Sequence, residues 1–369
     1  MYYSAEEQYW IWLSSVEEIG PITFFKLLNL YKSPRSVWDA LGESGFPEKM
    51  TFLNKRAWRN LKAARNEAYL FRLFDRLDRA GIRALTRLSE DYPAELMPLP
   101  APPPTLYTLG YGTLDDPRMI SIVGSRRSTR DGQRAALQIA RGLAEANVTV
   151  VSGMARGIDT YAHEGCLSAD GRTIAVLGNG LDMAYPPENR DLMDRIIDSG
   201  GMVISEYPPG VAPLPQHFPA RNRIISGLAR GTLLIEGADR SGAMSTINHA
   251  LDQGKDVFAL PGSIFSPVSA APNRLIVAGA IPAISHIEIL DYYHWDMPTK
   301  RKGAPPAEKV QLSDDERALV EPMRDQELSF EELRQLTGFS AQKINSYLTM
   351  LELRGIIVKV PGGMYRAYL

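Results

Sequence analysis

Residues Met119–Arg126 read MISIVGSR, and this motif is the clearest indication of the fold class. Its apolar, partly β-branched run is followed directly by Gly124, which is typical of a buried strand that ends in a tight turn. Comparable runs recur downstream and are separated by helical patterns: Val148–Val151, Thr173–Leu177, Met202–Ile204, Thr232–Ile235 and Val257–Leu260. Because buried strands alternate with helices, we predict an α/β fold with a Rossmann-like, doubly wound, mostly parallel sheet.

The sequence on either side of this region predicts two smaller domains and two linkers. Residues 5–85 follow helical spacing, and six prolines between Pro93 and Pro104 indicate a stiff linker, because proline blocks regular structure. We divide the chain into a SAM-like or helix-hairpin-helix-like helical domain (1–92), a Pro-rich linker (93–112), the Rossmann-like domain (113–295), a second linker (296–310) and a winged-helix domain (311–369).

Two short features of the terminal domains bear on nucleic-acid binding. The turn Val16–Ile22 resembles a helix-hairpin-helix turn that could offer backbone N–H groups to a phosphate, but it contains two glutamates, which favours a plain packing role. The C-terminal domain shows three predicted helices and a hairpin, the first helix capped by Ser313 with Glu316. Its would-be recognition helix, Ala341–Arg354, carries few cations, which argues against a winged-helix transcription factor that grips duplex DNA.

Composition excludes several classes of protein. The chain has 369 residues, 44% hydrophobic, and a net charge of −2, so it is not intrinsically disordered. A single cysteine, Cys166, excludes an internal disulfide, and the five histidines lack metal-ligand spacing. No apolar run is long enough to cross a membrane. We therefore expect a cytoplasmic protein with no metal, no cofactor and no membrane contact.

Charge is spread almost evenly along the sequence. Residues 1–111 carry 14 basic and 13 acidic side chains, and residues 112–295 carry 16 and 19. A nucleic acid would therefore be bound by a few placed groups and not by a broad positive field. Fifteen of the 16 basic residues in 112–295 are arginine, the side chain suited to forked phosphate contacts.

Glycine-rich turns follow the predicted strands and contain the candidate site. Gly124, Ser125 and Arg126 could hold an anion at a helix N-terminus. Arg126 stands where a dinucleotide-binding loop has its second glycine, so a dinucleotide cofactor is disfavoured. Phe218 and the arginines after it combine an aromatic ring with forked cations, as a base and its phosphates require. The candidate DNA-binding residues are Gly124, Ser125, Arg126, Gly153, Arg156, Gly157, Phe218, Arg221, Asn222, Arg223, Ser241, Gly242 and Thr246.

Taken in order, seven motifs resemble those of the DNA-processing protein A (DprA/Smf) family. The matching stretches are Val123–Arg126, Ser152–His163, Gly178–Pro186, Ser205–Pro208, Phe218–Ile225, Glu236–Gly242 and Pro261–Ala280. The sequence departs at Ala243, where many members have Ser, and at Ala271, where a Gly is usual. The resemblance implies a non-enzymatic homodimer that binds single-stranded DNA on its Rossmann-like domain. It also implies protection of incoming strands and help in loading RecA-type recombinase during natural transformation.

Residue types alone leave several roles open. Arg126, Arg221 and Arg223 could bind phosphates or could pair with Asp159, Glu206 and Glu236, and the resemblance favours phosphates, with Arg223 the clearest exception. Phe218 could stack on a base or belong to the core.

Two enzymatic alternatives also remain at this point. Asp159 and His163 could be a catalytic pair, although they more readily shape the loops of the site. A Rossmann-like nucleotide N-glycosidase of the lysine-decarboxylase-like group would use Glu236 as its acid. That group's PGGxGT loop is reduced here to Pro261-Gly262-Ser263, which disfavours this alternative.

Overall fold

The structure is a computed structural model that describes residues 3–42, 52–238, 241–296, 312–324, 326–353, 356–360 and 364–367. The chain forms two compact units, Met1–Pro298 and Thr299–Leu369. The first unit contains both the N-terminal helices and the sheet, so these two parts of the chain are packed together. The second unit has its own hydrophobic core.

A nine-stranded sheet forms the centre of the first unit, in the order β1-β2-β6-β5-β4-β3-β7-β8-β9. Neighbouring strands from β6 to β9 run parallel, whereas β1 and β2 pair antiparallel. The strands are β1 (Arg83–Thr86), β2 (Thr105–Gly110), β3 (Met119–Val123), β4 (Thr149–Ser152), β5 (Thr173–Leu177), β6 (Met202–Ser205), β7 (Gly231–Leu234), β8 (Asp256–Ala259) and β9 (Ile281–Pro282). The six predicted strands agree with β3 to β8 to within one residue at either end, and the mostly parallel Rossmann-like sheet is confirmed.

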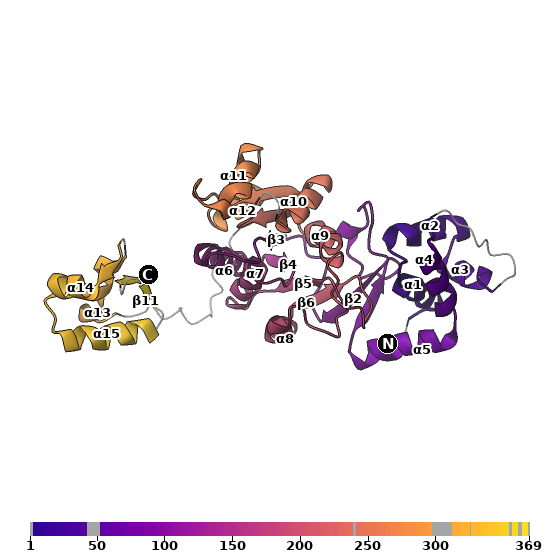
Figure 1. Cartoon of the computed structure of the whole chain (residues 1–369), viewed down its shortest axis with the longest axis horizontal. Helices are drawn as coiled ribbons and strands as arrows, with labels where there is room; N and C mark the ends of the chain where they lie inside the picture. Colours follow the sequence, from indigo (N-terminus) through magenta and orange to yellow (C-terminus); the bar gives the residue numbers. More distant parts are fainter. Residues whose placement is uncertain are drawn as a thin grey trace. The chain divides into compact units, whose positions relative to one another are not determined.

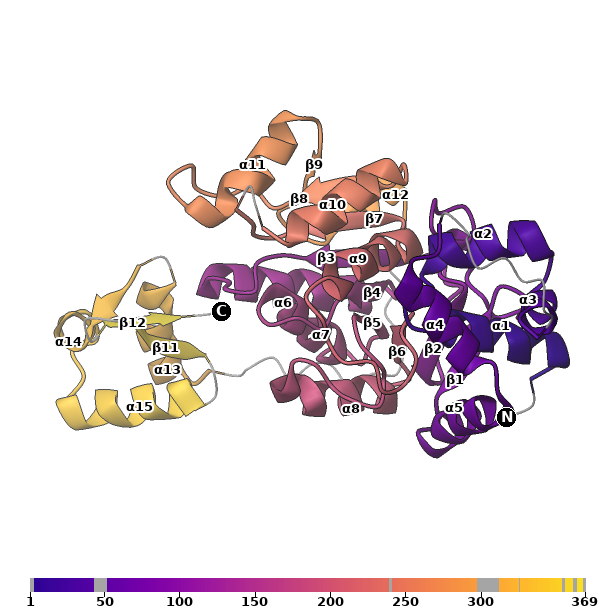
Figure 2. The same ribbon diagram turned by 45° about the vertical axis from the view of Figure 1, so that its right-hand side comes forward.

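Helices cover both faces of this sheet, as the doubly wound prediction requires (Figures 1 and 2). Side chains alternate along β3, so that Met119 and Val123 join one core while Ile120 and Ile122 join the other. The first core also takes side chains from α9 (His217–Leu228) and α10 (Ala243–Asp252), and the second from α6 (Arg130–Glu145), α7 (Ile158–Leu167) and α12 (Ile287–Tyr293). The two remaining helices of this part are α8 (Arg190–Asp198) and α11 (Ala270–Val277).

The N-terminal part is helical, as predicted, but its helical region ends before residue 85. Its helices are α1 (Ala5–Ser15), α2 (Pro21–Tyr31), α3 (Pro34–Ala40), α4 (Lys55–Ala64) and α5 (Glu67–Arg79). Gly20 caps α2 and Pro21 occupies its first turn. Most of these helices share a core that includes Trp12 and Phe24.

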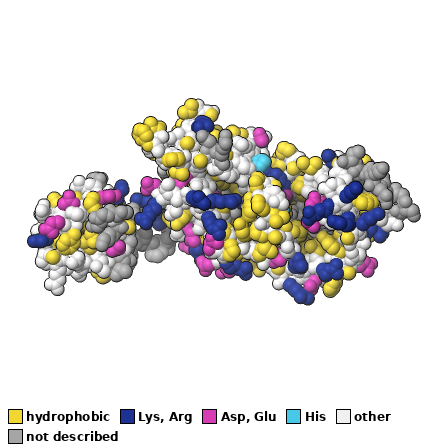
Figure 3. Space-filling view, in the orientation of Figure 1, with side chains coloured by type: hydrophobic (Ala, Val, Ile, Leu, Met, Phe, Trp, Pro, Cys, Tyr) yellow, Lys and Arg dark blue, Asp and Glu magenta, His cyan; other side chains and the backbone are white. Residues whose placement is uncertain are grey.

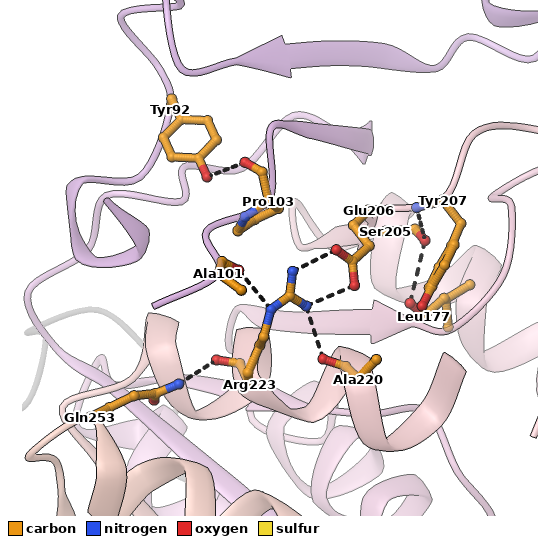
Figure 4. A network of polar contacts seen from close by, with 10 residues as sticks. All are labelled: Tyr92, Ala101, Pro103, Leu177, Ser205, Glu206, Tyr207, Ala220, Arg223 and Gln253. Atoms are coloured by element: carbon orange, nitrogen blue, oxygen red, sulfur yellow. Dashed lines mark hydrogen bonds and ion pairs between the residues drawn. The ribbon is translucent and has the colours of Figure 1, made fainter. Parts of the chain in front are cut away.

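The segment 93–112 is not a linker, which corrects the sequence prediction. Pro102–Pro104 are buried, and two carbonyls of this segment accept hydrogen bonds. Tyr92 donates its hydroxyl to the Pro103 carbonyl at 2.6 Å (Figure 4). Trp10 Nε1 donates to the Pro104 carbonyl at 2.6 Å. The prolines also stop at residue 104, so the following residues are free to form β2. Residues 93–104 are therefore held in place by hydrogen bonds and lead directly into β2. We call this segment the Pro-rich strap.

The second unit has the winged-helix pattern. Its helices are α13 (Asp314–Val320), α14 (Phe330–Thr337) and α15 (Ala341–Leu353), and its strands are β10 (Leu328–Ser329), β11 (Ile357–Val360) and β12 (Met364–Ala367). The predicted capping box of Ser313 and Glu316 is confirmed. Helix α13 ends at Val320, and a 3₁₀ turn follows it from Glu321 to Met323. The hairpin turn 361–363 and the second linker lie outside the described residues, apart from Asp296 at the linker's start.

Candidate nucleic-acid interface

A backbone hydrogen bond joins the loops after β3 and β4 at the carboxyl edge of the sheet. The Ile158 backbone N–H donates to the Ser125 carbonyl at 3.2 Å. Gly157 has a φ of 75°, and a Cβ on it would stand 2.3 Å from the same carbonyl oxygen. A residue with a side chain would therefore push the two loops apart. This contact brings together Gly124, Ser125 and Arg126 on one side and Arg156 and Gly157 on the other.

Behind these loops, Arg221 of α9 and Asp159 of α7 are buried on either side of Gly153. Arg221 Nη1 donates to the Gly153 carbonyl at 2.9 Å and also to the carbonyl of Val176. One Asp159 carboxylate oxygen accepts from the backbone N–H of Gly153 at 3.1 Å. A Cβ on Gly153 would lie 2.7 Å from both side chains, so glycine is required here by close approach. Arg221 therefore shapes the loop from inside and is not a direct phosphate ligand, contrary to the prediction for it.

Burial governs the charge of both groups. It raises the pKa of the Asp159 carboxyl to about 6, against the attraction of Arg221, and it lowers the pKa of the Arg221 guanidinium to about 10. Their mutual attraction opposes this effect and favours the charged form of each side chain. Arg126, at the surface, also lowers the pKa of Asp159, so one buried carboxylate faces two arginines.

Arg126, which is exposed, and Phe218, which is partly buried, form the outer part of the site. The Arg126 guanidinium carbon lies 5.3 Å from the centroid of the Phe218 ring, within cation–π range. The Tyr185 ring lies 5.3 Å from the Phe218 ring at an angle of 31°. Phe218 belongs to the first turn of α9 and not to a loop, and it packs against Gly178. A cation and two aromatic rings thus share one surface.

A shallow depression of about 390 Å³ lies beside this surface. Three predicted residues line it, namely Arg126, Arg156 and Gly157. Its other lining residues were missed by sequence reasoning: Arg127, Ser128, Gln133, Thr160, Tyr161 and Asn189. Arg127 follows directly on a quoted motif and could have been included, whereas Gln133 and Asn189 come from helix turns that only the fold brings near. Arg156 is also paired with Glu188.

Arg223 belongs to the interior, which corrects the prediction that it binds DNA. Its guanidinium makes a forked pair with Glu206, at 2.7 Å and 2.6 Å, and its Nε donates to the Ala101 carbonyl at 2.8 Å (Figure 4). Both charged side chains are almost fully buried. Arg223 therefore ties α9 to the end of β6 and to the Pro-rich strap.

The α10 side of the candidate site is only partly exposed. Gly242 is exposed and caps α10, and its carbonyl lies 3.5 Å from Asn222 Nδ2. Ser241 is partly exposed, but Thr246 is buried in the core-facing side of α10 and cannot touch a ligand in this conformation. Among these residues, Gly242 and Asn222 are best placed to border the site.

This chain is similar to known proteins over most of its length. Residues 83–294 match the family described as DNA recombination-mediator protein A, and residues 303–363 match the DprA winged helix domain. Protein Smf of Synechocystis is 32% identical over 98% of this chain and 99% of its own length. Protein Smf of Escherichia coli is 38% identical over 75% of each chain. This chain belongs to the DprA/Smf family.

Two solved structures of DprA proteins extend the comparison. DprA of Streptococcus pneumoniae superposes with a TM-score of 0.62 and 31% identity, covering 79% of this chain and 98% of its own. DprA of Helicobacter pylori, whose structure is described as giving insight into its single-stranded DNA binding mode, has a TM-score of 0.52 and 29% identity. It covers 58% of this chain and 97% of its own.

The catalytic alternatives find little support in this DprA/Smf chain. His163 is fully buried, its Nδ1 lies 2.7 Å from the Thr173 hydroxyl, and it does not line the depression. Burial lowers its pKa to about 3. Asp159 shapes the loop, as described above. The Glu236 carboxylate accepts from the backbone and hydroxyl of Thr129 at the start of α6, so it caps a helix.

Two other kinds of feature are absent from the described ranges. There, no cluster of three or more His, Cys, Asp or Glu side chains could hold a metal ion. None of the helices in those ranges combines the length and apolar character that a membrane crossing needs.

Proposed function

We propose that this chain binds single-stranded DNA at the carboxyl edge of β3, β4 and β5, through Arg126, Phe218 and the depression beside them. The observation that carries the proposal is the exposed Arg126 guanidinium held over the Phe218 ring. A phosphate contact and a stacking face stand together there, and single-strand binding uses that combination without reading base edges. The single-strand binding mode described for the Helicobacter pylori relative supports the same choice.

The finer role follows from family membership and is part of the proposal. The protein protects incoming single strands and assists the loading of a RecA-type recombinase in natural transformation. It acts as a homodimer in the cytoplasm, without catalysing a reaction. Exposed apolar side chains around α11 support a protein contact there: Phe265 and Val277 are 88% and 89% exposed, and hydrophobic side chains are visible at that end of the first unit in Figure 3.

Binding is tested by fluorescence anisotropy with a labelled oligonucleotide, as a single strand and as a duplex, across a salt series. We expect a clear preference for the single strand with little dependence on base sequence. Arg126→Ala should weaken binding and reduce the salt slope by about 0.7, the value for one phosphate contact on a single strand. Arg141→Ala, which removes an exposed arginine of α6 far along the helix, is the matched control.

Equal affinity for the duplex, or wild-type binding by a folded Arg126→Ala protein, would remove the proposed site. The N-glycosidase alternative has its own test, incubation with nucleoside monophosphates. Release of free base that depends on Glu236 would replace the proposed function with an enzymatic one.

A further inference from the structure

Helix α4 of the N-terminal part carries several positive charges close together, which the net charge of residues 1–111 does not reveal. Its ten residues, KRAWRNLKAA, include four cations and no acid. The whole of 1–111 has a net charge of only +1, because acidic residues elsewhere offset these cations. Lys and Arg side chains are visible over this helical part in Figure 3.

Three of the four cations point away from the core as one stripe. Ala57, Leu61 and Ala64 are the buried face of α4. The same i, i+4, i+7 spacing, shifted two residues toward the N-terminus, gives Lys55, Arg59 and Lys62. A shift of two residues turns about 200° around the helix, so these cations lie on the side opposite the buried face. All three side chains are exposed. We call these three residues the basic stripe.

The surroundings of the basic stripe leave its charge available. Among the residues that the structure describes, Lys55 and Arg59 form no ion pair, while the nearby Glu17 and Glu18 are engaged by Arg56 on the flank of the helix. Lys62 Nζ lies 4.6 Å from the centroid of the Trp58 ring, so an aromatic face adjoins the stripe. Lys55 and Arg56 occupy the first turn of the helix, where the macrodipole disfavours cations. Arg56 is offset there by its pairs with Glu17 and Glu18, whereas Lys55 forms no ion pair among the described residues, so its position at the helix start points to a binding role.

We infer that the basic stripe is a second nucleic-acid contact, which binds backbone phosphates and lies apart from the site at the edge of the sheet. The stripe spans about 10 Å along the helix, enough for about three phosphates of one strand. A protein partner fits less well, because the centres of protein interfaces are depleted in charge. The phosphates belong either to a distal part of the strand held at the sheet or to a separate strand.

The test uses the full chain with a short oligonucleotide of about 8 nucleotides and a long one of about 40. The variant Lys55→Gln/Arg59→Gln/Lys62→Gln removes the stripe. The control Lys32→Gln/Arg141→Gln/Arg230→Gln removes the same charge from exposed positions on other elements. Folding of both is checked by circular dichroism and urea titration.

If one strand reaches both places, the stripe variant should bind the long oligonucleotide at least tenfold more weakly. Its salt slope should also fall by about 2, because three contacts of about 0.7 each are lost. If separate strands bind, the short oligonucleotide should bind at two per chain in the wild type and at one in the stripe variant. The control should behave as the wild type.

Wild-type affinity, slope and stoichiometry in the folded stripe variant would overturn the inference, and an acidic protein partner would then be the remaining interpretation of the stripe. This outcome is separate from a failure at the sheet, which Arg126→Ala reports with the short oligonucleotide.

Discussion

Arg156 lines the depression and is paired with Glu188, and both side chains are exposed. A bound phosphate must compete with Glu188 for that guanidinium, since surface ion pairs are weak and exchange readily. We therefore predict that Glu188→Gln raises affinity for single-stranded DNA by about two- to fivefold and steepens the salt dependence by up to one phosphate contact. Anisotropy titration at several salt concentrations measures both. An unchanged affinity would place the strand away from Arg156.

Arg126 and Arg221 should respond to substitution in different ways, although both are arginines in quoted motifs. Arg221 bonds two buried carbonyls, so Arg221→Ala should lower the free energy of unfolding by about 3 kcal/mol or more, because it also leaves Asp159 buried without its cation. The folded fraction should keep its salt slope. Arg126→Ala should lower the slope and leave unfolding by urea nearly unchanged. Reversed results would mean that the two roles are exchanged.

His163 predicts a specific pH dependence of stability. Thr173 donates its hydroxyl to the Val150 carbonyl, so His163 Nδ1 is the donor to Thr173, and the buried Nε2 has no partner among the described residues. A proton on Nε2 would be buried without an acceptor, in agreement with the lowered pKa. Because the pKa is lowered from 6.5, the contribution of neutral His163 is present above that pH and is lost as the pH falls toward 3.

The measurement compares urea unfolding of the wild type and His163→Asn, which keeps a donor for Thr173. Between about pH 7 and pH 5 the wild type should lose about 1–2 kcal/mol relative to the variant. The opposing titration of Asp159 is common to both proteins and cancels in the difference. If the free energies of unfolding of the two proteins changed in parallel with pH, His163 would not be a neutral group in the folded protein.

At the scale of single residues, the chemical type of the candidate site residues could be predicted from the sequence, but which of them are exposed could not. Arg126, Arg221 and Arg223 have the same side chain and lie in motifs of the same kind. Their separation into one exposed cation and two buried ones depends on how α9 packs against β5 and on the Pro-rich strap. Those are long-range contacts that spacing along the chain does not encode.

At the scale of elements, helix α4 allows a prediction that separates stability from binding. Lys55→Glu places an acid in the first turn, where the helix dipole favours it, and should raise the free energy of unfolding by about 0.3–1 kcal/mol. The same change should weaken binding of the long oligonucleotide. Urea titration and anisotropy on one preparation test both. A loss of stability would mean that a contact of Lys55 outweighs the dipole.

The six central strands could be predicted because each is a short apolar run, in most cases next to a glycine or serine, and is buried on both faces of the sheet. The antiparallel strands β1 and β2 were missed for different reasons. Strand β1 has four residues and follows a helix closely, so helical spacing appeared to continue through it. Strand β2 directly follows Pro104, and the proline content hid it. Both pair antiparallel at one side of the sheet, where βαβ periodicity gives no signal.

At the scale of the whole molecule, the winged-helix unit is predicted to be dispensable for basic single-strand binding. It has its own core, with Leu319, Leu333 and Leu348 among its buried residues, so its removal should leave the first unit folded. Residues 311–369 carry 7 basic and 9 acidic side chains, and Lys343 of α15 is already paired with Asp315. A chain of residues 1–310 should therefore bind a single-stranded oligonucleotide within about threefold of the full chain, because few phosphate contacts are lost. Circular dichroism checks its folding and anisotropy its affinity. A tenfold loss, about 1.4 kcal/mol, in a folded truncated protein would assign the winged helix a direct part in holding the strand.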